Sequence, residues 1–247
     1  MQLLIKKEKY ILGRNILLWL SFACICFAAL FSAKSYVYDL TYRQDAVGIF
    51  DSMVYDSVIW IIFLSVVFSV VVGSNFAYRT IDNEVFAGQS RYAIYFSKFL
   101  VYDVVFCSLL LIYPILGMLC MISALGISGN LYVAFSHILL NVLVMFIQYS
   151  AILSFVIFIV ILCGDILKST AINGLIALLS GLIVAYGNPA GWFDSIKILK
   201  MMPIQQVRDL ISKKASITAG PQILSGLVLV ITFNLLALVL FKRKALK

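Results

Sequence analysis

Long apolar runs alternate with short polar segments along the whole chain. A helix that crosses a bilayer needs about 20 mostly apolar residues, and six stretches of the sequence provide runs of about this length. No stretch shows the alternation that is typical of membrane-spanning strands. The pattern therefore predicts an all-α integral membrane protein with a single domain, residues 1–247. Its six spanning helices are expected at residues 16–33, 58–78, 99–125, 134–163, 171–186 and 223–241.

Residues 1–15 precede the first span and mix apolar with basic side chains. The apolar positions are Leu3, Leu4, Ile11 and Leu12, and the basic positions are Lys6, Lys7, Lys9 and Arg14. Such a segment is typical of a short amphipathic helix that lies on a membrane surface with its lysines against lipid phosphates. The alternative is a frayed basic flank of the first span.

Residues 34–57 connect the first two spans and carry four aspartates at intervals of five or six residues. A calcium loop needs its oxygen ligands closer together, with a glycine turn between them. The spacing therefore predicts a solvated acidic loop rather than a metal site. The four aspartates are Asp39, Asp45, Asp51 and Asp56.

The connection between the second and third spans has the pattern of a short helix. Thr80 is a helix-capping residue and Gly88 a natural stop. Acidic side chains in the first turn suit the helix dipole. The acids are Asp82 and Glu84, and the apolar ridge is Ile81, Val85 and Phe86. The ridge has two interpretations that the spacing does not separate: it docks into a groove of another protein, or it packs against this chain's own helices or lipid.

The longest connection, residues 187–222, lies between the fifth and sixth spans. Pro203 suits a first helical turn, and Ile204 and Val207 share one face with Arg208 as a polar neighbour. We expect one or two helices at the outer interface, with the apolar row facing the membrane. A re-entrant hairpin is the other arrangement that the pattern allows, and it requires that protein cover the backbone.

The composition and the charge distribution agree with a membrane protein and predict its orientation. Hydrophobic residues make up 63% of the chain and charged residues 12%, whereas soluble domains are about 25% charged. This balance excludes a cytosolic enzyme, a disordered chain and a secreted disulfide scaffold. With both termini on one side, that side has twelve basic and four acidic residues, a net charge of +8. The other side has seven basic and six acidic residues, a net charge of +1, and Asp103 within a span accounts for the difference from the total.

The positive-inside rule therefore predicts cytoplasmic termini. A basic surface on that side indicates contact with anionic lipids rather than with nucleic acid.

The sequence contains few groups that could carry chemistry. It has no phosphate-binding P-loop and no catalytic serine or zinc motif, and His137 is its only histidine. We therefore expect no catalytic residue, no metal site and no cofactor in this chain. Asp103 is the one carboxylate well inside a span. It forms a structural ion pair near Lys98, or it handles a proton or a substrate.

Ala177 and Gly181 form a small-x-x-x-small pair in the fifth span. Such a pair allows close approach of another helix, in this chain or in a second subunit.

The stretch Phe76–Arg91, which reads FAYRTIDNEVFAGQSR, is followed by Ser97 and Lys98. It resembles the inner segment of ABC type-2 permeases, in which an aromatic span end leads to a polar N-E-x-x-x-G segment and a serine–arginine pair. The six spans, the basic N-terminal segment and the long outer connection are similar to that family in layout. The likeness is closest to small Gram-positive permeases that export peptides such as lantibiotics or give immunity to them.

The resemblance implies several expectations. Residues 80–88 are the coupling helix that docks into a separate cytoplasmic ATPase subunit, which holds ATP and magnesium. The expected coupling residues are Thr80, Asp82, Glu84, Val85, Phe86 and Arg91. Two permeases, copies or paralogues, form a dimer with two ATPase chains. Asp103, Ile204, Val207 and Arg208 are candidates for the path of a peptide or amphipathic substrate, and the location is the plasma membrane of a bacterium.

Two other classes of function remain open at this point. One is a secondary transporter or channel that uses Asp103 as an ion or proton relay. The other is a polytopic membrane enzyme, which the lack of catalytic clusters disfavours.

Overall fold

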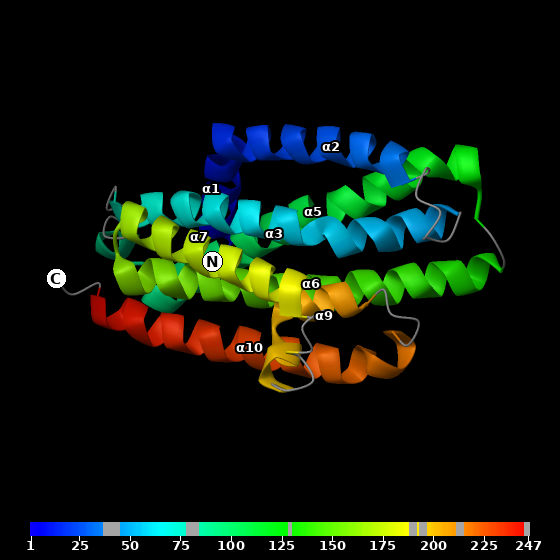
Figure 1. Ribbon diagram of the computed structural model, residues 1–247. Coiled ribbons are helices and arrows are strands. Elements are labelled where there is room, and N and C mark those ends of the chain that lie inside the picture. Colours follow the sequence, from blue (N-terminus) through cyan, green and yellow to red (C-terminus); the bar gives the residue numbers. More distant parts are fainter. Residues whose placement is uncertain are drawn as a thin grey trace.

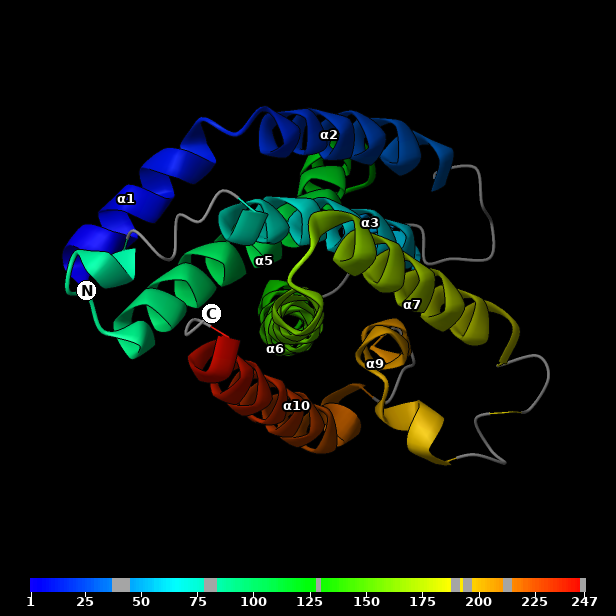
Figure 2. The same ribbon diagram turned by 90° about the vertical axis from the view of Figure 1, so that its left-hand side faces the viewer.

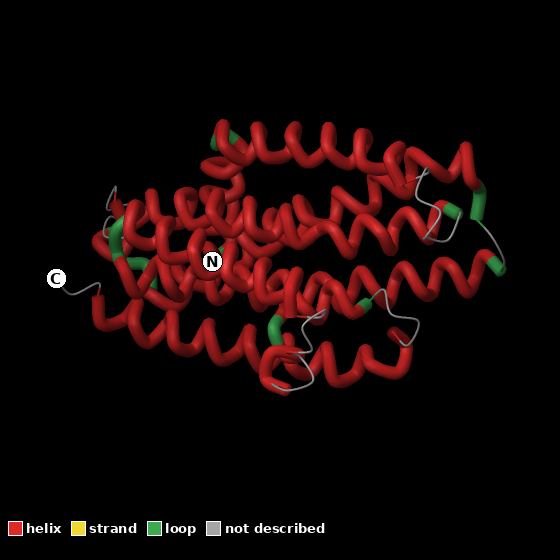
Figure 3. The backbone as a smooth tube through the Cα atoms, in the orientation of Figure 1, coloured by secondary structure: helices red, strands yellow, loops and turns green. Residues whose placement is uncertain are grey.

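The computed structural model describes residues 1–36, 45–77, 84–127, 130–187, 192, 197–210 and 215–244. In this part of the chain the regular secondary structure is entirely helical (Figure 3). Six of the helices are long and apolar enough to cross a membrane. The predicted all-α membrane protein with six spanning helices is therefore confirmed. The helices are α1 (Gln2–Gly13), α2 (Ile16–Tyr36), α3 (Ala46–Ala77), α5 (Arg91–Leu125), α6 (Leu131–Cys163), α7 (Ile166–Gly187), η1 (Lys197–Met201), α9 (Pro203–Asp209) and α10 (Ala215–Lys244).

The long helices run roughly side by side, and α6 lies at the centre (Figures 1 and 2). It contacts α3, α5, α7, α9 and α10, and it is the most buried of the six spans. Helix α2 lies at the margin of the bundle and packs on α5 and α3. The short helix α1 crosses one end of the bundle from α2 to the start of α5 (Figure 2). We call this the basic end, because Lys7, Arg91, Lys98, Lys168 and Lys242 lie there.

Local capping explains where several helices begin and end. The Ser90 side chain accepts a hydrogen bond from the backbone N–H of Ala93 at the start of α5, and Asn130 caps α6 in the same way. Gly164 has a φ of +67°, the left-handed conformation that ends α6. The chain turns back there at once, and Asp165 caps the start of α7.

Helix α3 begins at Ala46, not at Val58 as the apolar pattern predicts. The expected solvated acidic loop is wrong for the residues described here, 45–57. Asp45 is buried and caps α3 by accepting a hydrogen bond from the N–H of Gly48 at 2.8 Å. Asp51 lies 3.1 Å from Nε2 of His137 on α6. Asp45 therefore caps α3 and Asp51 connects α3 to α6, while Asp39 lies outside the described residues.

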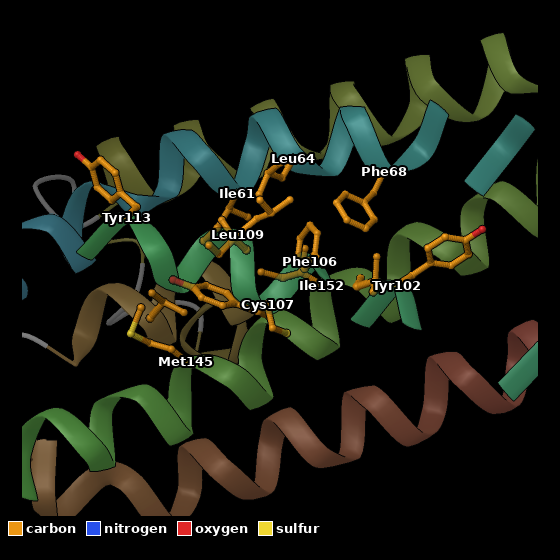
Figure 4. Packing of buried hydrophobic residues seen from close by; sticks show 14 of the residues in the cluster. Ile61, Leu64, Phe68, Tyr102, Phe106, Cys107, Leu109, Tyr113, Met145 and Ile152 are labelled. Carbon is orange, nitrogen blue, oxygen red and sulfur yellow. The ribbon is translucent and has the colours of Figure 1, made fainter. Parts of the chain in front are cut away.

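Aromatic and branched side chains from three helices fill the centre of the bundle. Ile61, Leu64 and Phe68 of α3 meet Phe106 of α5, and Met145 and Ile152 approach from α6 (Figure 4). The Phe68 and Phe106 rings meet edge to face, with centroids 5.0 Å apart. This packing fixes α3 and α5 against α6, the framework on which the other helices lie.

The small face of α7 packs inside this chain. A Cβ atom on Gly181 would lie 2.6 Å from Cδ1 of Ile62 on α3, and Ala177 on the same face is buried. The close approach that the Ala177–Gly181 spacing predicts is thus made with α3. Neither residue is available on this face for a second subunit.

We expect Gly181→Leu to lower the free energy of unfolding by about 1–3 kcal/mol, because the new side chain overpacks the α3–α7 contact. The matched control is Ala185→Leu, at an exposed position of the same helix. Unfolding of the purified protein in detergent measures both variants. Equal stability of the two would contradict the observed contact.

Candidate functional site

The expected coupling segment is only partly described, because Thr80 and Asp82 fall outside the described residues. Residues 84–86 form one helical turn, and the Gly88 N–H donates to the carbonyl of Val85 at 3.0 Å. Gly88 has a φ of +80°, so it ends the turn in the left-handed conformation. The segment therefore closes where the sequence predicts that it does.

The Glu84 carboxylate lies in the protein interior. Its Oε1 atom lies 2.6 Å from Nζ of Lys7 on α1 and 3.4 Å from Nζ of Lys98 on α5. Lys98 also donates to Oε1 of Glu8 at 2.5 Å. Only 1% of Glu8, 5% of Glu84 and 8% of Lys98 is exposed. We use the name ion-pair clasp for the set Lys7, Glu8, Glu84 and Lys98. Glu84, one of the expected coupling residues, is therefore bound by a buried cation of this chain.

The clasp continues into α3 through two further hydrogen bonds. The Tyr102 hydroxyl donates to Oε2 of Glu8 at 3.1 Å, and the Asn75 side-chain N–H donates to the Tyr102 oxygen at 2.7 Å. One connected polar network therefore holds α1, the Glu84 segment, α5 and the end of α3. All its members except Lys7 are buried, so movement of the segment requires movement of at least one of these helices or breakage of buried polar contacts.

The apolar ridge divides into a buried and an exposed part. Val85 is partly buried against the core, whereas 87% of Phe86 is exposed. A large aromatic side chain that points away from the bundle, on a segment fixed from beneath, is typical of a protein contact. The other expected ridge residue, Ile81, lies outside the described residues.

Arg91 connects the same region to the last helix. Its Nη1 atom donates to the carbonyl of Lys242 at 2.7 Å, at the C-terminal end of α10. The Lys242 ammonium lies 4.0 Å from the centre of the Tyr92 ring. The start of α5 and the end of α10 are therefore joined beside the clasp.

Asp103 lies between α5 and α6, one helical turn beyond the clasp. Ser150 donates to its Oδ2 atom at 3.0 Å, and the Cys107 thiol lies 3.7 Å from Oδ1. The expected ion pair near Lys98 is not made, because Glu8 and Glu84 bind that ammonium. Within the described residues, Asp103 has neutral partners on both oxygens.

The α9 helix lies inside the bundle and not on its surface. It runs alongside α6 and packs on α3, α6, α7 and α10 (Figures 1 and 2). Ile204 and Val207 are buried, so their expected membrane-facing position is wrong. The Arg208 guanidinium lies 3.9 Å from the centre of the Tyr55 ring and donates to the carbonyl of Val184 at 2.5 Å. Helix α9 is therefore covered by protein on several sides, as a re-entrant arrangement requires.

A glutamine cluster fixes α9 to the centre of the bundle. Gln148 of α6 donates to Oε1 of Gln206 at 2.5 Å and to the carbonyl of Gln222 at 2.7 Å. Ser225 of α10 donates to the same Gln206 oxygen at 2.8 Å. Gln148 is fully buried. Sequence analysis missed it, although Gln148 and Asn141, the two side-chain amides in this 33-residue apolar helix, were a visible signal.

A cavity of about 420 Å³ lies where α9 leaves space between α7 and α10. Both helices pack on α6, but they make little or no direct contact with each other. The walls are mostly apolar, and Ser65, Asn173 and Ser180 contribute the few polar side chains. A cavity of this size accepts a small apolar or amphipathic ligand.

The described residues contain no cluster of three metal-ligating side chains. The polar groups of the bundle instead form helix-to-helix contacts. The cavity between α7 and α10 has room for an apolar or amphipathic ligand.

Comparison of the sequence with protein-family models gives no match. Comparison with curated proteins gives no match either. The resemblance to ABC type-2 permeases therefore stays a prediction that rests on residues 76–98 and on the layout.

We expect Lys98→Met to weaken the basic end by about 3–5 kcal/mol, because it leaves two buried carboxylates without their shared cation. The matched control is Lys7→Met. The Lys7 side chain is 45% exposed, and an exposed partner contributes about 0–1 kcal/mol. Denaturant unfolding gives the stability of each variant, and limited proteolysis shows whether α1 stays attached. Equal losses in the two variants would mean that Lys98 does not hold the clasp together.

Proposed function

We propose that this chain is the membrane-spanning permease subunit of an ATP-driven exporter. ATP and magnesium belong to a separate cytoplasmic ATPase subunit, and two permease chains form the working dimer. The observation that carries the proposal is the exposed Phe86 on a segment whose base is fixed by buried ion pairs. The sequence likeness of residues 76–98 to ABC type-2 permeases is the second support.

The mechanism follows from how the segment is attached. A partner that binds Phe86 moves the turn at residues 84–86, and Glu84 is joined to Lys98 of α5 and Lys7 of α1. Because burial makes these ion pairs costly to break, the pull is transmitted to α5 and α1. Helix α5 packs on α2, α3 and α6, so a small displacement at the segment reaches the centre of the bundle.

The proposed substrate is an amphipathic or hydrophobic peptide. The cavity between α7 and α10 supports this class, because its walls are largely apolar. No charged residue lines the cavity in the described part of the chain. An ionic substrate would lose its hydration there without compensation.

The proposed orientation places the basic end in the cytoplasm. That end carries the excess of basic residues, which the positive-inside rule assigns to the cytoplasmic side of a bacterial plasma membrane. It also brings Phe86 to the compartment that contains ATP.

Asp103 supports a second candidate, a proton-coupled transporter. It is 8% exposed and bonded to a hydroxyl and a thiol, an environment in which a carboxyl group can exchange a proton. We expect neither the purified wild-type chain nor Asp103→Asn to carry a pH-driven proton flux in liposomes, since the exporter takes its energy from ATP. A proton flux in the wild type that Asp103→Asn abolishes would favour the transporter.

We expect Phe86→Ala to weaken binding of the ATPase about 30-fold, because removal of an interface aromatic costs about 2 kcal/mol or more. The variant should still insert and unfold like the wild type, since 87% of the side chain is exposed. Tyr10→Ala is the matched control, an exposed aromatic on α1 at the same end. Purification of each tagged chain from native membranes, followed by a magnesium-dependent ATPase assay, measures the bound subunit.

Two results would contradict the proposal. One is a wild-type chain that purifies from native membranes with no ATPase activity. The other is equal ATPase recovery with Phe86→Ala and Tyr10→Ala, which would show that this segment is not the docking site.

A further inference from the structure

A second cavity lies at the basic end, between α1, α2 and α5. Its volume is about 360 Å³. Figure 2 shows α1 crossing from the start of α2 to α5, and the residues that line the crevice come from these three helices. Leu12 of α1, Leu18 of α2 and Val105 of α5 are among its apolar walls. It is separate from the cavity between α7 and α10.

The crevice is elongated along α5. Val101, Val105 and Leu109 line it at four-residue intervals, which places them on one face of the helix over about 12 Å. Trp19 and Phe22 of α2 form the opposite wall. Such a long apolar slot has the shape of a single hydrocarbon chain.

The mouth of the crevice is cationic. Lys9 is the only charged side chain among its lining residues in the described part of the chain, and it makes no ion pair there. Lys6 and Arg14 of α1 are also exposed. The one acidic residue of α1, Glu8, is buried in the clasp and does not offset this charge.

We propose that the crevice binds one anionic phospholipid of the surrounding membrane leaflet. Its phosphate lies against the Lys9 ammonium, and one acyl chain lies between α2 and α5. The combination decides the class: an apolar slot alone would accept any lipid, and exposed lysines alone would attract any anion. This inference rests on the membrane-spanning fold and on the crevice, and it does not require the exporter proposed above.

A lipid in this position would brace the clasp. Helix α1 carries Lys7 and Glu8, which reach Glu84 and Lys98, and also Lys9 and Leu12, which border the crevice. A ligand that binds the folded α1 and not a detached one stabilises the folded position. Anionic lipid would therefore hold α1, and through it the Glu84 segment, in place.

The test is native mass spectrometry of the delipidated full-length protein in detergent, titrated with phosphatidylglycerol or phosphatidylcholine of the same acyl chains. We expect one phosphatidylglycerol to bind at least fivefold more tightly than phosphatidylcholine. Lys9→Gln should remove this preference, whereas Lys6→Gln on the same helix should leave most of it. Both positions are exposed, so the fold is kept.

A second pair of variants tests the acyl-chain site. Val105→Phe fills the crevice and should lower phosphatidylglycerol binding about tenfold or more, whereas Val104→Phe, at the next position but 57% exposed, should not. Equal binding of the two lipids by the wild type would overturn the proposal. So would equal effects within either pair of variants, because binding would then be general attraction to the surface. The lipid titration does not depend on whether an ATPase purifies with the chain. A failure of the exporter proposal can therefore be distinguished from a failure of the lipid-site proposal.

Discussion

The position of Lys98 between two buried carboxylates determines how the basic end is built. An ammonium group at a largely buried site is stable only if acidic groups and hydrogen bonds surround it. Glu8 comes from α1 and Glu84 from the segment after α3, so the requirement of one cation orders two pieces of chain far apart in sequence. Tyr102 and Asn75 complete the shell from α5 and α3. The surface helix α1 is therefore a fixed part of the bundle.

The same requirement explains the rest of the interior. Hydrocarbon offers no hydrogen-bond partner, so polar side chains on spanning helices must find one within the protein. Helix α6 lies at the centre and supplies Ser150 to Asp103, Gln148 to Gln206 and Ser154 to the Asn234 side chain of α10. Each contact connects α6 to a different element. Polar pairs thus specify which helices are neighbours. The apolar side chains fill the space between the helices, but they pack equally well against lipid and so specify neighbours less strictly.

The sequence predicted the number of spans, the helix before the first span and the turn at Gly88, because these follow from local hydrophobicity and from single residues with special backbone preferences. It predicted the wrong start for α3, because Asp51 and Asp56 make residues 46–57 less hydrophobic than a typical span. In the structure Asp51 has a partner in His137. The burial of Glu8 had a signal. Leu4, Glu8 and Leu12 recur every four residues, on one face of α1, and all three are buried.

The partners of the charged residues had no such signal. Lys98 lies five residues from Asp103 in the sequence, and proximity along the chain suggested an ion pair between them. On a helix, residues three or four apart share a face and residues five apart diverge. The ammonium points to α1 and the carboxylate to α6. Only the three-dimensional packing of α1 against α5 decides this choice.

The α9 helix shows a different use of burial. Its seven residues are too short to cross a membrane, yet Ile204 and Val207 occupy positions beside α3 and α6 that a full-length span would otherwise fill. The glutamine cluster holds α9 against α6, and next to the first residues of α9 the space between α7 and α10 stays open as the 420 Å³ cavity. A continuous helix at this place would close that opening. A short helix keeps this space open. Hydrogen bonds from Gln148 and Ser225 fix α9 without the apolar contact area of a long helix. The cavity is thus a consequence of replacing hydrophobic packing with a few buried hydrogen bonds.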